Sequence, residues 1–109
     1  MQADEILNTA QTYQQQIQVV MTQKAALTLE LNEIKKAIEE LERTKQGDVF
    51  KISGPILIRV DAKDLKKELD DKKELINLRI KTLEKQENKL KEKIEELRNK
   101  LLNVRKNSR

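Results

Sequence analysis

The side chains that most often carry catalysis or metal binding are missing from this sequence of 109 residues. It contains no Cys and no His, which excludes thiol nucleophiles, disulfides, soft-metal sites and histidine acid–base chemistry. The Asp, Glu, Lys and Ser that remain would need a cleft that perturbs their pKa values before they could catalyse a reaction. We therefore expect no enzyme activity, no cofactor and no metal site.

Residues suited to binding other proteins are gathered near the N-terminus. From Ile6 to Gln23, eighteen consecutive residues carry no charge, and seven of the nine Gln lie within the first 23 residues. Exposed apolar groups on such a surface could contact many apolar segments without a defined pocket. The alternative is that a helix seam simply continues to the end of the chain and leaves scattered exposed apolar residues.

A second group of binding residues lies in the central stretch DVFKISGPILIRVD, residues 48–61. Its period-two alternation around Gly54–Pro55 predicts a β-hairpin, with the proline at the turn or at the first position of a strand. An isolated hairpin is at best marginally stable in water, and its unpaired edges invite pairing with another chain. Either other subunits complete this hairpin, or it is a folded connection that does not associate. Its apolar residues are Val49, Phe50, Ile52, Ile56, Leu57, Ile58 and Val60.

Two long amphipathic helices must position these two groups of binding residues, the uncharged N-terminal segment and the central hairpin. Apolar positions recur in steps of four and three from Ile6 to Leu41, and the same rhythm runs from Ile76 to Val104, which indicates coiled-coil heptads. Helices of about 42 and 45 residues, joined by a short segment, favour an antiparallel pair with both termini at one end. We expect one mainly α domain: a coiled-coil helix over 1–46, a β-hairpin over 47–61 and a returning helix over 62–109.

Local signals mark the helix ends and one polar position in each seam. Gly47 is expected to end the first helix in the left-handed conformation, after Arg43 and Lys45 in its last turn. The Asp61 carboxylate is expected to cap a helix beginning at Ala62. Lys24 and Glu87 interrupt the two seams, and two interpretations are open. They form a polar layer that fixes the register, or both side chains reach out of a thin seam into solvent.

Charge and hydropathy narrow the possible partners. Charged residues make up 39% of the chain and hydrophobic residues 37%, so a narrow apolar stripe must serve as the core. The net charge is +4, but acidic and basic residues alternate along most of the chain, which argues against nucleic acid. No apolar run approaches the roughly 20 residues that span a bilayer, and the N-terminus has no signal-like block. We expect a soluble, cytoplasmic protein that binds neither nucleic acid nor membrane.

Three segments together resemble the prefoldin family in its archaeal form: QKAALTLELNEIKKAIEEL, VFKISGPILIRVDAKDL and LRIKTLEKQENKL. They follow the family's order and spacing, and the likeness covers roughly residues 11–101. The Ser-Gly-x-Ile-Leu-Ile hairpin is the most specific element. One hairpin per chain is similar to the β type of the family, because the α type carries two.

The resemblance implies an ATP-independent holding chaperone. Two α-type and four β-type chains would join through their hairpins into a β-barrel, to which the seven apolar hairpin residues would contribute. The coiled-coil tips would hold unfolded proteins, prevent their aggregation and deliver them to a group II chaperonin. The tip residues of this chain would be Ile6, Leu7, Ala10, Tyr13, Leu97, Leu101, Leu102 and Val104.

Two other functions remain as alternatives. An architectural coiled coil explains the seams but gives no purpose to the hairpin or the uncharged segment. An RNA-binding coiled-coil arm requires a basic stripe and stacking aromatics, and the chain has one Tyr and one Phe. The basic tail, Arg105, Lys106 and Arg109, could contact an acidic chaperonin surface or could serve only as a solubilising end.

Overall fold

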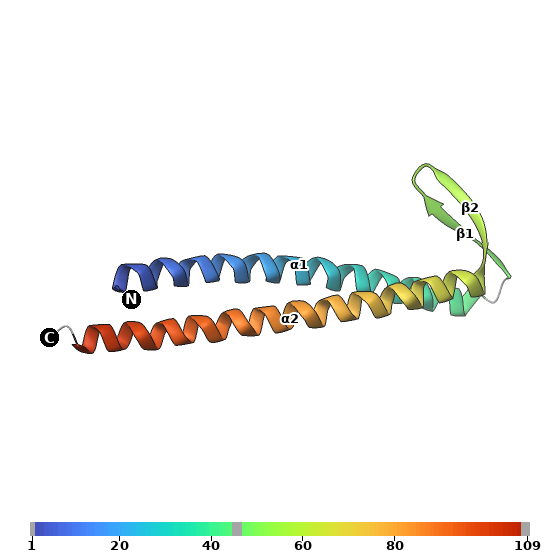
Figure 1. Ribbon diagram of the computed structural model, residues 1–109. Helices are drawn as coiled ribbons and strands as arrows, with labels where there is room; N and C mark the ends of the chain where they lie inside the picture. Colours follow the sequence, from blue (N-terminus) through green and yellow to red (C-terminus); the bar gives the residue numbers. More distant parts are fainter. Residues whose placement is uncertain (1, 45–46, 108–109) are drawn as a thin grey trace. The chain divides into compact units, whose positions relative to one another are not determined.

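The computed structural model describes residues 2–44 and 47–107. In this part of the chain, helix α1 (Ala3–Thr44) is followed by strands β1 (Asp48–Ser53) and β2 (Ile56–Asp61) and by helix α2 (Ala62–Asn107) (Figure 1). The prediction of two long helices around one antiparallel hairpin is confirmed. Residue contacts divide the chain into two compact units: Met1–Ala26 with Ile80–Arg109, and Leu27–Arg79.

The first unit is an antiparallel pair of helical segments, one from α1 and one from α2 (Figure 1). Its buried apolar side chains come from the predicted seam: Ile6, Ile17 and Val20 on α1 and Leu97 on α2. Each such side chain contributes roughly 1.5 to 3 kcal/mol when it leaves water. The start of α1 and the end of α2 lie at the same end of this unit (Figure 1).

The second unit contains the end of α1, the hairpin and the start of α2. Its buried apolar residues again occupy seam positions: Leu31, Ile34 and Ile38 on α1 and Ile76 on α2. An exposed ion pair joins Lys66 Nζ to Glu42 Oε1 at 3.3 Å, and such a pair adds little stability. Apolar burial along the heptads therefore holds these two helical segments together.

The hairpin closes through a two-residue turn at Gly54–Pro55. The strands pair from Asp48 opposite Asp61 to Ser53 opposite Ile56. Gly54 has a φ of 58°, whereas a proline ring holds φ near −65°. A positive φ at the first turn position followed by a negative one fits a type II′ turn and excludes type I′. Glycine is needed at the first position because other L-residues are strained there.

The prediction that Gly47 ends α1 in the left-handed conformation is wrong. Among the described residues, only Gly54 is a glycine with positive φ. Gly47 instead directly precedes β1, and its carbonyl oxygen accepts a hydrogen bond from the Ala62 N–H at 2.9 Å. This bond continues the hairpin ladder by one residue, so strand pairing and not helix capping sets the backbone at this position.

Of the other signals at the helix ends, two lie in the described part. Arg43 is in the last turn of α1. The Asp61 carboxylate accepts a hydrogen bond from the Lys63 N–H at 2.7 Å, which confirms it as the cap of α2. Lys45, the predicted helix end at residue 46, and Arg109 of the basic tail lie outside the described residues.

Candidate functional site

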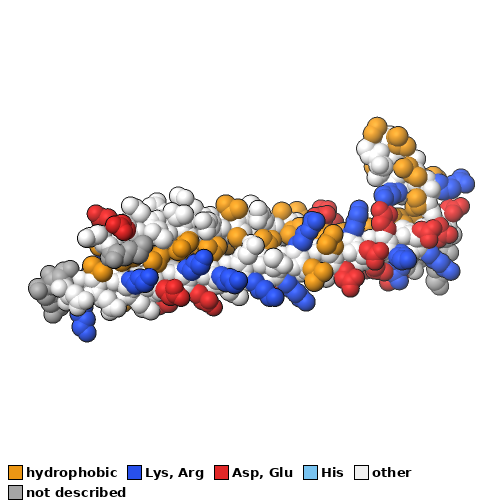
Figure 2. Space-filling view, viewed as in Figure 1, with side chains coloured by type: hydrophobic (Ala, Val, Ile, Leu, Met, Phe, Trp, Pro, Cys, Tyr) orange, Lys and Arg blue, Asp and Glu red, His pale blue; other side chains and the backbone are white. Residues whose placement is uncertain are grey.

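An uncharged helix surface covers most of α1 in the first unit. Figure 2 shows this surface as mainly white beyond the acidic start of the helix, whereas Lys, Arg, Asp and Glu side chains recur along the side of α2 seen in this view. Three threonine hydroxyls on this surface are already used within the helix. Those of Thr9, Thr12 and Thr22 each donate a hydrogen bond to the backbone carbonyl four residues earlier. The remaining polar groups are mostly Gln and Asn side chains, which carry no net charge.

The predicted tip residues lie at different depths in this unit. Ile6 is only 1% exposed, and Leu97 is also buried between the helices. Ala10, Tyr13, Leu101 and Val104 are half-buried along the same seam. Leu7 and Leu102 are exposed, at 50% and 53%. Leu7 and Leu102 are therefore the two predicted tip residues on the surface, and the other six form the packing beneath them.

Two further apolar side chains on α1 are exposed in the same unit. Val19 and Met21 lie in the uncharged segment, C-terminal to Tyr13, the last predicted tip residue of α1. Together with Leu7 and Leu102 they form what we call the apolar tip surface. The set consists of Leu7, Val19, Met21 and Leu102. Its three α1 members are separated by uncharged polar residues, and Leu102 lies on α2, so the set offers dispersed contacts.

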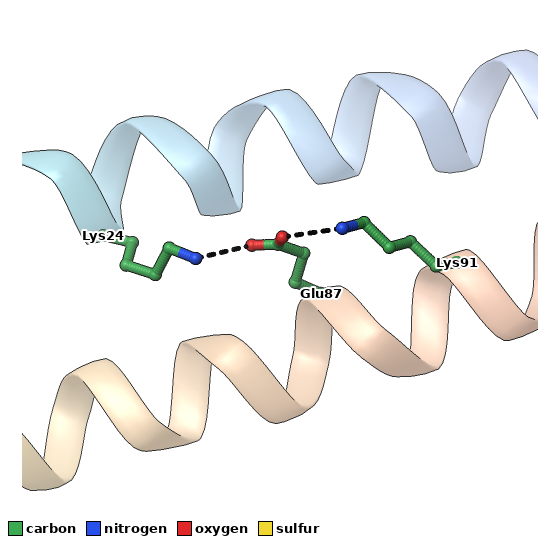
Figure 3. A network of polar contacts seen from close by, with 3 residues as sticks. All are labelled: Lys24, Glu87 and Lys91. Carbon is green, nitrogen blue, oxygen red and sulfur yellow. Dashed lines mark hydrogen bonds and ion pairs between the residues drawn. The ribbon is translucent and has the colours of Figure 1, made fainter.

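A polar cluster interrupts the seam of the first unit (Figure 3). Glu87 is 8% exposed, and its two carboxylate oxygens bind Lys24 Nζ at 3.0 Å and Lys91 Nζ at 3.1 Å. The hydrogen bonds from Lys24 and then Lys91 lower the pKa of Glu87 and outweigh burial, which acts to raise it. Of the two interpretations of Lys24 and Glu87, the polar layer is therefore the one observed.

The hairpin has one half-covered face and one exposed face. Residues paired across the strands lie on the same face, so Val49 and Val60 share a face with Lys51 and Ile58. Val49, Lys51 and Val60 are half-buried. The opposite face carries the exposed side chains of Phe50, Ile52 and Leu57, and Ile52 is 75% exposed. Ile56 and Ile58, on the first face, are exposed as well.

An ion pair that the sequence did not suggest joins the hairpin to α2. Lys51 Nζ lies 2.7 Å from Glu68 Oε1. This hydrogen bond lowers the pKa of Glu68 more than burial raises it, and the charges of Lys51 and Lys72 lower it further. The only sign of this ion pair in the sequence was a lysine at the centre of an apolar strand. Which carboxylate it binds depended on how the hairpin packs on α2.

The sequence also did not reveal a groove between the two helices of the first unit. Its volume is about 460 Å³. From α1 it is lined by Gln16, Val19, Val20 and Gln23. From α2 it is lined by Gln86, Lys89, Leu90 and Lys93. The available signal was the uncharged Gln at positions beside the seam, where coiled coils usually carry charged pairs.

In residues 2–44 and 47–107, no three metal-binding side chains gather where they could hold an ion. Neither helix contains, over its described length, an apolar stretch long enough to cross a bilayer. The surfaces on which function can be argued are therefore the apolar tip surface, the exposed hairpin face and the groove.

Comparison with known proteins gives a consistent result along the chain. The family model described as "Prefoldin subunit" matches residues 4–107. The chain is 41% identical to the prefoldin subunit beta of Thermococcus onnurineus over 92% of its own length and 87% of that protein. It is 39% identical to the prefoldin subunit beta of Archaeoglobus fulgidus, covering 94% of this chain and 90% of that one.

A solved structure extends the likeness to three dimensions. The crystal structure of the prefoldin beta subunit from Thermococcus strain KS-1 matches with a TM-score of 0.88 at 36% sequence identity. The match covers 94% of this chain and 91% of that one. The heptad seams, the central hairpin and the similarity over nearly the whole length lead to one conclusion: the chain belongs to the prefoldin subunit family, a family of chaperone subunits and not of enzymes.

Proposed function

We propose that this chain is a subunit of an ATP-independent holding chaperone of the cytoplasm. It binds unfolded proteins at the coiled-coil tip, prevents their aggregation and delivers them to a group II chaperonin. The observation that carries this proposal is the apolar tip surface, three of whose four members lie in a helix segment without charge. Apolar side chains separated by uncharged polar groups can bind many sequences weakly, which is what a protein that holds unfolded chains requires.

The packing beneath the tip surface supports the same function. The seam ends near Ile6 and Val104, so its last residues have neighbours on one side only, and helix ends fray. Opening of about the first two turns of α1 and the last two turns of α2 would add Ile6, Ala10 and Leu101 to the exposed apolar area. In the proposal, Leu7 and Leu102 make the first contacts, and Tyr13, Leu97 and the other seam residues join when the tip opens.

The hairpin is proposed to join the subunits. Its exposed face and unpaired strand edges would be completed by the hairpins of other subunits in a β-barrel, within a hexamer of two α-type and four β-type chains. Support comes from the exposure of Phe50, Ile52 and Leu57 in a two-stranded sheet. Such a sheet is only marginally stable alone, and its open edges favour pairing with another chain.

The experiment that tests the holding function follows aggregation by light scattering. A chemically denatured protein is diluted into the complex of this chain with its α-type partner, with and without ATP. We expect the full-length complex to suppress scattering equally under both conditions. A complex whose chain lacks about ten residues at each end should assemble but lose suppression, because the apolar contacts at the tip contribute the binding energy.

Point variants separate loss of the surface from loss of the fold. The double variant Leu7→Ser with Leu102→Ser removes two exposed side chains and should leave the seam intact. Leu29→Ser is the matched control, because Leu29 is an exposed leucine of α1 in the other unit. If the double variant still suppresses aggregation, the client-binding site does not lie at the tip. No suppression by a normally assembled full-length complex would favour an architectural coiled coil.

A further inference from the structure

The groove of the first unit has walls with regular helical spacing. The lining residues of α1 and those of α2 each follow the pattern i, i+3, i+4 and i+7, which is two turns of one helix face. The groove therefore runs along the helix pair for roughly 10 Å at 1.5 Å per residue. A third helix laid along such a groove would insert its side chains between those of the walls, as helices do when ridges pack into grooves.

Backbone hydrogen bonding favours a helix over an extended segment as the occupant. Both walls are helices whose backbone groups are already paired within α1 and α2. An extended segment in the groove would find no strand edge to pair with, and its N–H and C=O groups would lose water without replacement. A helix satisfies its own backbone, so only its side chains need to fit the groove.

The lining has an apolar base and a basic rim on one side. Val20 and Leu90 are seam residues at the base, and Val19 is exposed beside them. Three glutamines and two lysines complete the lining, and none of the lining residues is acidic. Lys93 stands 5.4 Å from the centre of the Tyr13 ring. Neither Lys89 nor Lys93 forms an ion pair with a carboxylate in the part of the chain that the structure describes.

We propose that this groove is a docking site for an amphipathic, acidic helix of a partner protein. Apolar side chains one turn apart on that helix pack on Val19, Val20 and Leu90. Its carboxylates lie beside Lys89 and Lys93, whose charges no acidic side chain of the lining offsets. The contact is two turns long, well below the area of a stable interface, so binding is weak and rapidly reversible. The inference concerns the folded chain and does not depend on the proposed holding function.

The test measures fluorescence anisotropy of labelled peptides titrated with the full-length chain. The probe is an Ala-based helical peptide of about 16 residues, with Leu at i, i+3 and i+7 and Glu beside them. A scrambled peptide removes the apolar stripe, and a third peptide carries Lys in place of each Glu. We expect binding of the first peptide alone, weakened by salt because the charged contacts are partly exposed.

Matched variants locate the site. Lys89→Glu should weaken binding about fivefold, since it replaces an attraction by a repulsion, and it should allow the Lys-containing peptide to bind. Lys85→Glu is the control, because Lys85 lies one turn away on the same helix and outside the lining. Val19→Glu should weaken binding about tenfold by placing a charge against the apolar stripe, while the helical circular dichroism signal stays unchanged because Val19 is exposed.

Several results would overturn the proposal. These are equal effects of Lys89→Glu and Lys85→Glu, equal binding of the scrambled peptide, or no effect of Val19→Glu. Lys89-dependent binding of single-stranded RNA in place of the peptide would assign the groove to nucleic acid. Lys89-dependent self-association, seen by light scattering without peptide, would assign it to a second copy of the chain. Aggregation suppression is measured separately on the complex of the natural chain: if it fails while the natural chain still binds the peptide, only the holding function is lost, and if suppression persists while the natural chain does not bind the peptide, only the groove proposal is lost.

Discussion

At the scale of single residues, Glu87 is the charged side chain that is buried among the described residues. It is tolerated there because each carboxylate oxygen has its own lysine, Lys24 from α1 and Lys91 from α2 (Figure 3). A buried ion pair is weak evidence for stability, since desolvation offsets the attraction. Its effect on pairing is more specific: a shift of the two helices by one heptad would leave Lys24 and Glu87 facing apolar seam residues.

This cluster makes stability depend on pH. The lysines hold the pKa of Glu87 below its ordinary value of 4.5, so the folded chain binds this proton less readily than the unfolded chain. The cluster's contribution is complete above about pH 4.5 and is lost as the pH falls through the lowered pKa of the folded state. Urea unfolding between pH 7 and pH 3 should therefore show a smaller acid-induced loss for Glu87→Gln than for the natural chain.

The control for this measurement is Glu84→Gln. Glu84 is exposed and lies one turn before Glu87 on α2. Its replacement should leave the pH dependence nearly unchanged, although it removes the same charge from the same helix. If Glu87→Gln and Glu84→Gln gave identical profiles, the link between the cluster and acid stability would be refuted.

At the scale of elements, the junction between hairpin and helix depends on Asp61. This residue ends β2, opposite Asp48, and its side chain caps α2 through the Lys63 N–H. The adjacent bond from Ala62 N–H to the Gly47 carbonyl closes the hairpin at the same point. One residue thus ends a strand and begins a helix without any intervening loop, which fixes the direction in which α2 leaves the hairpin.

Removing the cap should destabilise the chain by a measurable amount. Asp61→Ala leaves a helix N–H without its partner and should cost about 1 kcal/mol of unfolding free energy. Asp61→Asn keeps an acceptor oxygen and should cost less. Urea unfolding followed by circular dichroism gives both values. Equal losses for the two variants would show that the negative charge near the helix N-terminus, and not the hydrogen bond, is the stabilising feature.

At the scale of the whole molecule, a chain with narrow seams and one hairpin exposes apolar surface in places where its own residues cannot cover it. Phe50, Ile52 and Leu57 share one such surface. Family members are subunits that assemble with other prefoldin subunits, and this surface is the exposed face of the hairpin. Assembly through it would bury side chains that each contribute roughly 1.5 to 3 kcal/mol.

Polar substitution on this face should therefore prevent assembly and spare the helices. The double variant Ile52→Ser with Leu57→Ser removes two side chains that are paired across the strands. Its mass in the mixture with the α-type partner, measured by chromatography with light scattering, should fall to that of smaller species. Leu29→Ser should assemble normally, and helix content should stay constant in both. Normal assembly of the double variant would place the subunit contact elsewhere.

The sequence by itself determined the secondary structure, the seams and the cap at Asp61. These features are local or periodic: a heptad repeats along one helix, and a cap joins residues two positions apart. The left-handed conformation predicted for Gly47 was wrong, because a hydrogen bond to Ala62, fifteen residues later, sets the backbone there. Only the tertiary structure decided that Lys24 meets Glu87, that Lys51 meets Glu68 and that an uncharged edge of α1 and a basic edge of α2 form a groove. Each of these depends on which segments lie opposite one another, and a pattern read along one chain does not contain that pairing.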